Sequence, residues 1–231
     1  MLKIENLSFA YGEVRALRDV ELEIPDGQIT CVTGRNGVGK STLMKNIVGL
    51  LQPAAGSITL DGRDLVDIPA HRRIHAGLAF VPQGRMIFPK LTVEENLRVG
   101  LAARSDRLRK IPDQVFDLFP VLKDMRSRMG GDLSGGQQQQ LSIGRALVTD
   151  PSLLILDEPT EGIQPNIVQQ IGQVLQQLVT DRGMTIVIVE QYLDFIREFS
   201  QQFCIMNRGR VVASGETKNL KEEIVKQYLG V

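Results

Sequence analysis

A glycine-rich stretch at residues 34–42, GRNGVGKST, matches the phosphate-binding pattern G-x-x-x-x-G-K-S/T. Its glycines let the backbone fold so that several N–H groups point at phosphate oxygens, and the following helix adds its positive N-terminal end. In this pattern Lys40 reaches the β- and γ-phosphates, and the Ser41 hydroxyl binds Mg²⁺. A plain glycine-rich turn is the alternative, but the stretch lies between a strand-like run and a helix-like run, as the pattern requires. We therefore predict that a nucleotide is bound by Gly34, Arg35, Asn36, Gly37, Val38, Gly39, Lys40, Ser41 and Thr42.

A second stretch, LLILDEP at residues 153–159, supplies the acidic half of the same chemistry. Its apolar residues predict a buried strand, and Asp157 and Glu158 stand at the end of that strand. We expect Asp157 to join the Mg²⁺ shell and Glu158 to polarise the attacking water. Adjacent strand residues point to opposite sides, but the backbone can leave the pleat at a strand end, so both could face the metal. An ordinary acidic loop is the alternative, which the phosphate-binding pattern upstream disfavours.

A third stretch, LSGGQQQQLSIGRAL at residues 133–147, has the features of a helix start. Ser134 could be a plain N-cap, which explains the serine but not both glycines. Gly135 and Gly136, with free N–H groups at a helix start, would make a second anion site. A chain with a complete phosphate-binding loop has no evident use for a second such site unless another nucleotide arrives there.

Four short apolar runs, at residues 28–34, 78–83, 153–159 and 184–191, are typical of parallel strands covered on both faces. Ligands of such sheets bind at the carboxyl ends of the strands. Polar residues follow these runs, namely Gly34–Thr42, Gln83, Asp157–Glu158 and Glu190–Gln191. We expect the run that ends at Glu190 to lie beside the one that ends at Asp157. Gln191 would then reach toward the γ-phosphate, and the alternative is that it merely caps a loop.

The remaining segments predict two additions to this α/β core. Residues 2–9 and 20–24 look like strands of an antiparallel piece at the N-terminus, and residues 203–215 like a hairpin that turns at 207–209. Residues 91–104 and 112–125 predict helices without a strand between them, and residues 218–230 predict a last helix. We therefore expect one domain over 1–231, with a helical subdomain inserted at about 88–150.

Length, charge and the lengths of the apolar runs limit the number of domains, the binding partners and the location of the chain. The 231 residues suffice for one sizeable core, and 27 basic residues balance 27 acidic ones, so no global charge favours nucleic acid. No apolar run reaches the roughly 18–20 residues that span a bilayer, and the N-terminus lacks a signal-peptide layout, so we expect a cytoplasmic location.

Cys31 and Cys204 lie in apolar runs and should be buried small hydrophobes. His71 and His75 lack a third metal ligand and should belong to a solvated helix face.

Taken together, the motifs resemble those of ABC-type ATPases, the nucleotide-binding subunits of ATP-driven transporters, over essentially the whole chain. GRNGVGKST is similar to the Walker A motif, FVPQG with Gln83 to the Q-loop, LSGGQ to the family signature and LLILDE to Walker B. Tyr11 in FAYG matches the aromatic position that stacks on adenine. This resemblance implies the fold of the family: a P-loop NTPase core with a mainly parallel sheet, an N-terminal antiparallel β subdomain and an inserted helical subdomain.

The resemblance also implies a split site. In this family the signature of one subunit closes on the ATP held by the P-loop of another, so that two ATP molecules lie head to tail between two chains. Ser134, Gly135, Gly136 and Gln137 would then contact the nucleotide of a second ATPase subunit, and Gln83 would orient the metal and the water. The chain departs from the family pattern at Gln164, where Asp is frequent, and at Gln191, where His is usual. Glutamine cannot ionise, so Gln191 can position water but not shuttle a proton.

Three further stretches, QGRMIFPKLTVEENL, EGIQPN and VEQYLDF, resemble subunits of branched-chain amino acid and urea importers, most closely the urea type. This implies a peripheral position on the inner face of the cell membrane, membrane permease subunits as partners and, indirectly, a separate solute-binding protein. The basic stretch 104–110 could face lipid headgroups or a membrane partner, or simply be a solvated face.

Two rival functions remain. A non-transport ABC ATPase acting in DNA repair or translation is one, although the chain has neither a long coiled coil nor a second cassette. The other, an unrelated P-loop kinase or GTPase, leaves LSGGQ unexplained.

Overall fold

The four compact apolar runs form neighbouring strands of a single sheet. The structure, a computed structural model, describes residues 1–104, 106 and 108–229. A six-stranded sheet has the order β10-β9-β3-β8-β7-β6, in which all neighbours are parallel except β10 and β9. Its strands are β3 (Ile29–Thr33), β6 (Leu78–Val81), β7 (Leu153–Asp157), β8 (Thr185–Val189), β9 (Gln202–Asn207) and β10 (Arg210–Glu216). The expected neighbours β7 and β8 are confirmed, with Asp157 opposite Val189.

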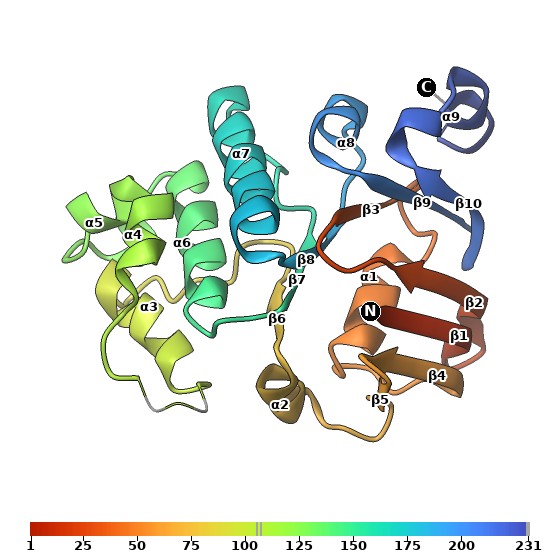
Figure 1. Cartoon of the computed structure of the whole chain (residues 1–231), viewed down its shortest axis with the longest axis horizontal. Helices are drawn as coiled ribbons and strands as arrows, with labels where there is room; N and C mark the ends of the chain where they lie inside the picture. Colours follow the sequence, from red (N-terminus) through yellow and green to blue (C-terminus); the bar gives the residue numbers. More distant parts are fainter. Residues whose placement is uncertain (105, 107, 230–231) are drawn as a thin grey trace.

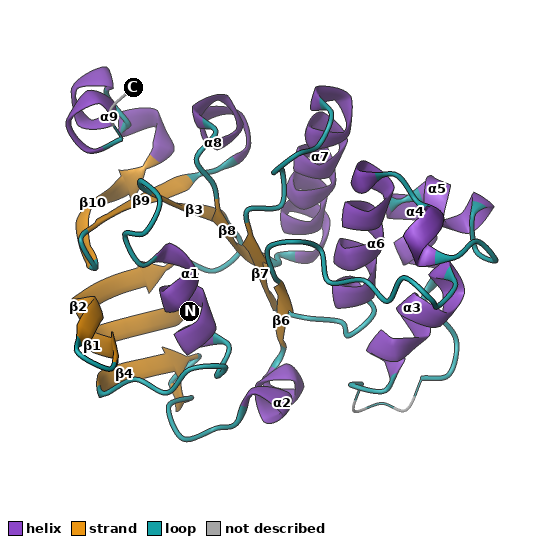
Figure 2. Ribbon diagram, turned by 180° about the vertical axis from the view of Figure 1, so that it is seen from behind, coloured by secondary structure: helices purple, strands orange, loops and turns teal. Residues whose placement is uncertain are grey.

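These strands read as continuous apolar runs because both faces of the sheet are covered. Leu154 and Leu156 of β7 join the core on the side of the larger helices, whereas Leu153 and Ile155 join the core on the opposite side. On that opposite side α1 (Lys40–Ile47) packs against the sheet (Figures 1 and 2). The helix that follows the glycine-rich loop is therefore held against this face of the six-stranded sheet.

A second, antiparallel sheet covers the outer side of α1. It has the order β2-β1-β4-β5 and confirms the expected antiparallel piece at the N-terminus. Its strands are β1 (Leu2–Tyr11), β2 (Val14–Ile24), β4 (Ala55–Leu60) and β5 (Arg63–Asp64). The last two follow α1 in the chain and were not expected from the sequence, because β4 borders solvent and has only Ile58 and Leu60 buried.

The segment expected to be helical gathers at one end of the molecule, far from the antiparallel sheet (Figure 1). Helix α3 (Val93–Leu101) starts with a capping box formed by Thr92 and Glu95. The prediction of a helix over residues 112–125 was wrong in one respect, because it is two short helices, α4 (Asp113–Leu118) and α5 (Pro120–Asp124). The chain breaks at Phe119, since the residue before a proline avoids the α-helical region. The limits of the subdomain at 88 and 150 stay a prediction.

The other helices connect the strands. They are α2 (Ala70–Arg73), α6 (Gly135–Leu147), α7 (Pro165–Arg182), α8 (Leu193–Phe199) and α9 (Glu222–Tyr228), with 3₁₀ turns at Ile74–Ala76, Gly130–Asp132 and Thr217–Asn219. The expected last helix is thus shorter than 218–230, and Gly230 lies outside the described residues. The hairpin of β9 and β10 turns at Arg208 and Gly209, which both have positive φ, as a two-residue type I′ turn requires.

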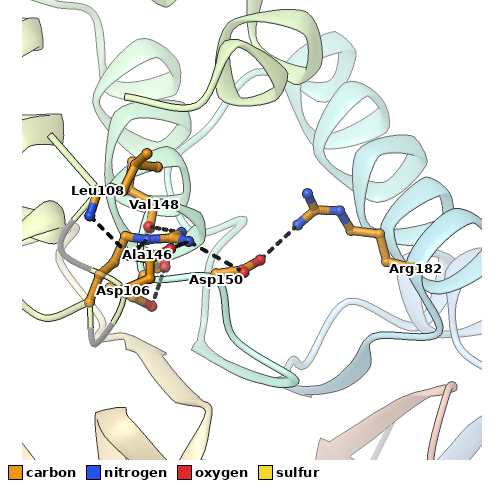
Figure 3. Close-up of polar contacts among 8 residues, drawn as sticks. Asp106, Leu108, Ala146, Val148, Asp150 and Arg182 are labelled. Atoms are coloured by element: carbon orange, nitrogen blue, oxygen red, sulfur yellow. Dashed lines mark hydrogen bonds and ion pairs between the residues drawn. The ribbon is translucent and has the colours of Figure 1, made fainter. Parts of the chain in front are cut away.

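The basic stretch 104–110 is exposed at Asp106 and at residues 108–110, as expected of a solvated face, but Arg104 is an exception. The Arg104 side chain is 10% exposed and pairs with Asp106 and Asp150, while Arg182 of α7 reaches Asp150 from the other side (Figure 3). Arg104 also donates to the Val148 carbonyl at 3.0 Å. The Arg104 guanidinium lowers the pKa of Asp106 to about 2. Arg104 therefore bonds the end of α6 and is linked to Arg182 of α7 only through Asp150; Ser105 and Arg107 lie outside the described residues.

The two cysteines and the two histidines lie in the environments expected from the sequence, whereas the burial of Arg73 was not expected. Cys31 and Cys204 are free and fully buried, as expected, and burial raises the pKa of the Cys204 thiol to about 12. His71 and His75 are exposed. Their neighbour Arg73 is instead 1% exposed and donates to four backbone carbonyls, including Asn46 and Ile47 at the end of α1. Within the described ranges, no helix is long and apolar enough to cross a membrane.

The contact of α7 with α8 gives a prediction about stability. A Cβ on Gly172 would come within 2.5 Å of the Phe199 ring, so only glycine fits there. Gly172→Leu gains about 1 kcal/mol of helix propensity but overpacks a buried contact, which costs about 1–3 kcal/mol or more. We expect a net loss of unfolding free energy, measured by urea denaturation. Gln173→Leu, on the exposed face of the same helix, is the control and should change it by less than about 0.5 kcal/mol. Equal values for the two variants would contradict the packing argument.

Candidate nucleotide site

The glycine-rich loop connects β3 to α1 and is shaped by close backbone contacts. Gly39, the N-cap of α1, has φ 109°, and a Cβ there would lie 2.7 Å from the Ala16 carbonyl oxygen of β2. Glycine is required at this position for both reasons. The helix therefore starts with its first N–H groups next to the loop, in the arrangement that binds phosphate.

Lys40 lies at the centre of this loop. Its side chain is buried, and its ammonium donates to the carbonyls of Gly34 at 2.7 Å and Arg35 at 3.1 Å. Burial lowers the pKa of Lys40, and the charges of Glu158 and Asp157 oppose that shift. A triphosphate would give the ammonium anionic acceptors, which form stronger hydrogen bonds than neutral carbonyls.

Ser41 and Asp157, the two predicted metal ligands, lie in contact. The Ser41 hydroxyl donates to Asp157 Oδ1 at 3.2 Å. Burial raises the pKa of Asp157, and the Ser41 hydrogen bond opposes that shift. A hydroxyl and one carboxylate are a donor set that fits Mg²⁺, which takes oxygen ligands and usually keeps several waters and substrate phosphates.

Glu158 leaves the pleat of β7, as the sequence allowed. Its φ is +48°, a left-handed conformation that costs about 1–3 kcal/mol and is concentrated at functional sites. Its N–H donates to the Val189 carbonyl at 3.0 Å, which fixes the turn against β8. The carboxylate then turns toward the loop instead of continuing the alternation of the strand.

Two glutamine amides hold the Glu158 carboxylate, one on each oxygen. Gln83 Nε2 donates to Oε2 at 3.0 Å, and Gln191 Nε2 donates to Oε1 at 2.7 Å. Gln191 Nε2 also donates to Asn36 Oδ1 of the glycine-rich loop at 2.8 Å. Among the described residues the amide oxygen of Gln83 accepts no hydrogen bond, so it could bind a metal or a water. The structure thus brings Gln83, Glu158 and Gln191 together beside the loop.

A cavity of about 750 Å³, within the usual range for a small-molecule site, is lined by Gln83 and Glu158, whereas Gln191 is connected to it through its bonds to Asn36 and Glu158. Tyr11, half exposed, lines it from the β1 side, where an adenine ring would stack. The predicted residues that line the cavity are Tyr11, Asn36, Gly37, Gly39, Lys40, Ser41, Thr42, Gln83 and Glu158. Gly34 and Val38 are buried within the loop, the exposed Arg35 contributes its carbonyl to Lys40, and Asp157 is reached through Ser41.

The signature residues line a different cavity, so the chain separates the two predicted half-sites. Ser134 caps α6 in a capping box, in which its N–H donates to Gln137 Oε1 at 2.9 Å and its hydroxyl accepts from the Gln137 N–H. Gln137 therefore serves the helix start itself. The Ser134–Gln137 segment lines a cavity with Gln164, away from Lys40.

Both glycines of the signature also have packing reasons, which the sequence did not reveal. A Cβ on Gly135 would lie 2.9 Å from the Arg85 guanidinium, and one on Gly136 would lie 3.0 Å from the Ile167 side chain. Arg85 itself has φ +68° and is held by the Ser142 hydroxyl, which donates to its carbonyl at 2.6 Å. Capping accounts for Ser134 and Gln137, and close packing on Ile167 limits the residue at position 136, while the Arg85 side chain next to Gly135 is flexible and can move.

Some polar residues at the site were missed or undervalued from the sequence. Glu161 accepts from Gln83 Nε2 at 3.0 Å, so Gln83 bridges it to Glu158. Glu190 is buried and accepts from both Thr160 and Gln191; it was noted only as a polar residue at a strand end. Gln164 is the N-cap of α7 but makes no side-chain cap, which a shorter Asp can do.

Known proteins resemble this chain over its whole length. The family model described as "ABC transporter" matches residues 17–161. The chain is 39% identical to the high-affinity branched-chain amino acid transport ATP-binding protein BraG of Pseudomonas aeruginosa, over 100% of both chains. It is 36% identical to the probable branched-chain amino acid transport ATP-binding protein LivF of Archaeoglobus fulgidus, over 96% of this chain and 94% of that one. The lipopolysaccharide export system ATP-binding protein LptB of Haemophilus influenzae is 31% identical, over 100% and 97%.

Solved structures agree in fold. The ADP conformation of MJ1267, an ATP-binding cassette of an ABC transporter, gives a TM-score of 0.85 at 29% identity, over 100% of this chain and 99% of that chain. A dimeric post-hydrolysis state of the ATP-binding cassette MJ0796, bound to ADP and Pi, gives 0.83 at 26% identity, over 94% and 99%. These likenesses confirm the fold class expected from the sequence.

The position of Gln191 gives a prediction about turnover. Gln191→Ala removes the donor from Glu158 Oε1 and frees Asn36, so we expect ATP hydrolysis to fall about tenfold or more with little change in ATP affinity. Gln191→His keeps a ring donor and should retain most of the rate. Steady-state kinetics at saturating Mg·ATP measure both. A Gln191→Ala protein that hydrolyses ATP like the wild type would leave Gln191 as a loop cap only.

Proposed function

Because the chain belongs to the ABC transporter family, as the ATP-binding ATPase subunit of such a transporter, we propose that it powers solute import by dimerising head to tail on two ATP molecules. The observation that carries the proposal is the separation of two half-sites on one chain. Lys40, Ser41 and Glu158 meet at one cavity, while Ser134 and Gly135 lie at another. The half-site at the glycine-rich loop lacks the signature residues, and the half-site at the signature lacks the loop and the carboxylates. The rival functions in DNA repair or translation find no support among relatives named for transport or export.

Hydrolysis follows from the residues around the γ-phosphate position. Lys40 and the N–H groups of the loop neutralise the phosphates, and Tyr11 stacks on the adenine. Mg²⁺, which Ser41, Asp157 and the amide oxygen of Gln83 would hold, supplies further charge neutralisation when bound. Glu158 accepts a proton from the attacking water, and Gln83 and Gln191 keep its two oxygens oriented. Since neither glutamine can ionise, the base is a carboxylate, and we assign it to Glu158 because both amides contact it.

A second ATPase subunit completes each site. Ser134, Gly135 and the start of α6 would contact the γ-phosphate of the ATP held by the partner's loop, with the helix N-terminus favouring that charge. The likeness to a cassette structure described as dimeric and bound to ADP and Pi supports this arrangement. Gln137 would act indirectly, because its side chain holds Ser134 through the capping box.

The remaining partners are membrane permease subunits and, through them, a solute-binding protein on the other side of the membrane. The subunit would then sit peripherally on the inner face of the cell membrane. The similarity to BraG and LivF, named for branched-chain amino acid transport, supports branched-chain amino acids as the solute. Urea is a second candidate because the loop stretches around Arg85 and Gln164 resemble those of urea importers. No binding to nucleic acid is proposed.

The choice of solute is testable in the cell of origin. Deleting the reading frame of this chain should reduce uptake of radiolabelled leucine, and restoring it should recover uptake. The complementing Glu158→Gln variant, which keeps the subunit present, should not recover it. Urea uptake is measured in parallel with the same three strains. Loss of urea uptake with normal leucine uptake would assign urea, and normal uptake of both would contradict importer function for these solutes.

The base assignment gives a prediction with an internal comparison. Glu158→Gln removes the proton acceptor, so we expect turnover to fall roughly 10²–10⁴-fold while Mg·ATP binding persists. Glu161→Gln changes the other carboxylate that Gln83 Nε2 contacts at 3.0 Å, and its loss should be smaller than tenfold. Phosphate release and equilibrium ATP binding are measured for both. If Glu161→Gln abolishes turnover and Glu158→Gln does not, the base is Glu161.

A further inference from the structure

Glu190 is a buried carboxylate that the mechanism above does not use. It follows β8 directly, is 4% exposed, and its N–H donates to the Val32 carbonyl at 3.2 Å. The carboxylate accepts hydrogen bonds from two loops. Oε1 accepts from the Thr160 N–H at 3.1 Å and from the Thr160 hydroxyl at 2.6 Å, and Oε2 accepts from the Gln191 N–H at 3.1 Å.

Burying the charged Glu190 carboxylate destabilises the fold unless hydrogen bonds satisfy its oxygens. A buried carboxylate loses its hydration, which hydrogen bonds must replace. Burial raises the pKa of Glu190, whereas its hydrogen bonds with Thr160, Gln191 and the backbone of Tyr192 lower it. Across the described part of the chain, no lysine, arginine or histidine forms an ion pair with Glu190. The carboxylate is therefore held almost entirely by donors from the loops at 160 and 191–192.

These two loops are the ones that carry Glu158 and its amide partner. Thr160 lies two residues after Glu158, and Gln191, next to Glu190, donates from its side chain to Glu158 Oε1 at 2.7 Å. The contacts close a ring that runs from Glu158 along the chain to Thr160, across to Glu190, on to Gln191 and back to Glu158. A shift of either loop must therefore move Glu158 relative to Gln191.

We propose that Glu190 is a positioning residue for ATP hydrolysis, which sets Gln191 against Glu158 by tying the loop after β7 to the loop after β8. This rests on the proposed role of Glu158 as the base. Loop 158–164 also borders the cavity of the signature residues through Gly162 and Gln164. Glu190 thus links the surface where a partner subunit would bind to the alignment of the base.

Glu190→Gln tests the link with little change in volume. Its amide can accept through one atom only, so one of the two loops loses its acceptor. We expect kcat to fall about tenfold with KM for ATP within about threefold, the pattern for a contact that matters mainly in the transition state. Thr160→Val removes the hydroxyl of the same link and should also lower kcat. The double variant should be no slower than Glu190→Gln alone, because both changes break one link.

Amide hydrogen exchange gives a readout that does not depend on turnover. In Glu190→Gln, exchange should rise both in peptides covering residues 158–164 and in peptides covering 190–193, because both loops donate to this carboxylate. Glu223→Gln, which removes an exposed carboxylate from α9, is the matched control and should change neither rate nor exchange. Circular dichroism establishes that each variant is folded.

The outcomes separate this inference from the proposed function. Wild-type kcat in folded Glu190→Gln, or kcat losses of Glu190→Gln and Thr160→Val that multiply in the double variant, overturns the positioning role. If Glu190→Gln does not fold, Thr160→Val carries the test, and unchanged kcat there overturns the role as well. Normal turnover in Glu158→Gln overturns the base assignment instead, and with it the premise of this inference.

Discussion

The chemistry of this molecule depends on the parallel pairing that brings the ends of β3, β6, β7 and β8 to one edge of the six-stranded sheet. In this register Asp157 lies opposite Val189, so the residues that follow the two strands must meet. Glu158 turns out of the pleat, and amides that follow β6 and β8 close on its carboxylate. The glycine-rich loop after β3 then places Lys40 and Ser41 against the same edge. A slip of β7 by one residue would turn its side chains to the opposite face of the sheet and take Asp157 away from Ser41.

Much of this edge could be predicted from the sequence because its signals are local. Strands covered on both faces must be apolar throughout, and polar residues directly after them must lie at the edge where ligands bind. The sequence therefore indicated Gln83, Asp157, Glu158 and Gln191 correctly as neighbours. The hairpin at Arg208 and Gly209 was equally readable from its turn residues.

What could not be predicted depends on contacts between distant segments. Nothing near Arg73 shows that its guanidinium caps α1, or near Arg104 that it bonds the end of α6 and Asp150. Gly135 and Gly136 appeared unexplained by capping because Arg85 and Ile167, their packing partners, are remote in the chain. Glu190 gave no signal of its role beyond its place at a strand end, since its partner Thr160 is 30 residues away.

The central claim is that the two half-sites complete each other between chains, and mixed dimers test it most directly. The Lys40→Ala chain lacks a working loop and the Gly135→Asp chain a working signature, so a mixture holds one complete site, formed by the loop of the second chain and the signature of the first. With an ATP analogue that carries a photoreactive group on the γ-phosphate, we expect labelling of residues 133–147 of the Lys40→Ala chain. Label confined to the Gly135→Asp chain, which binds the analogue itself, would contradict it.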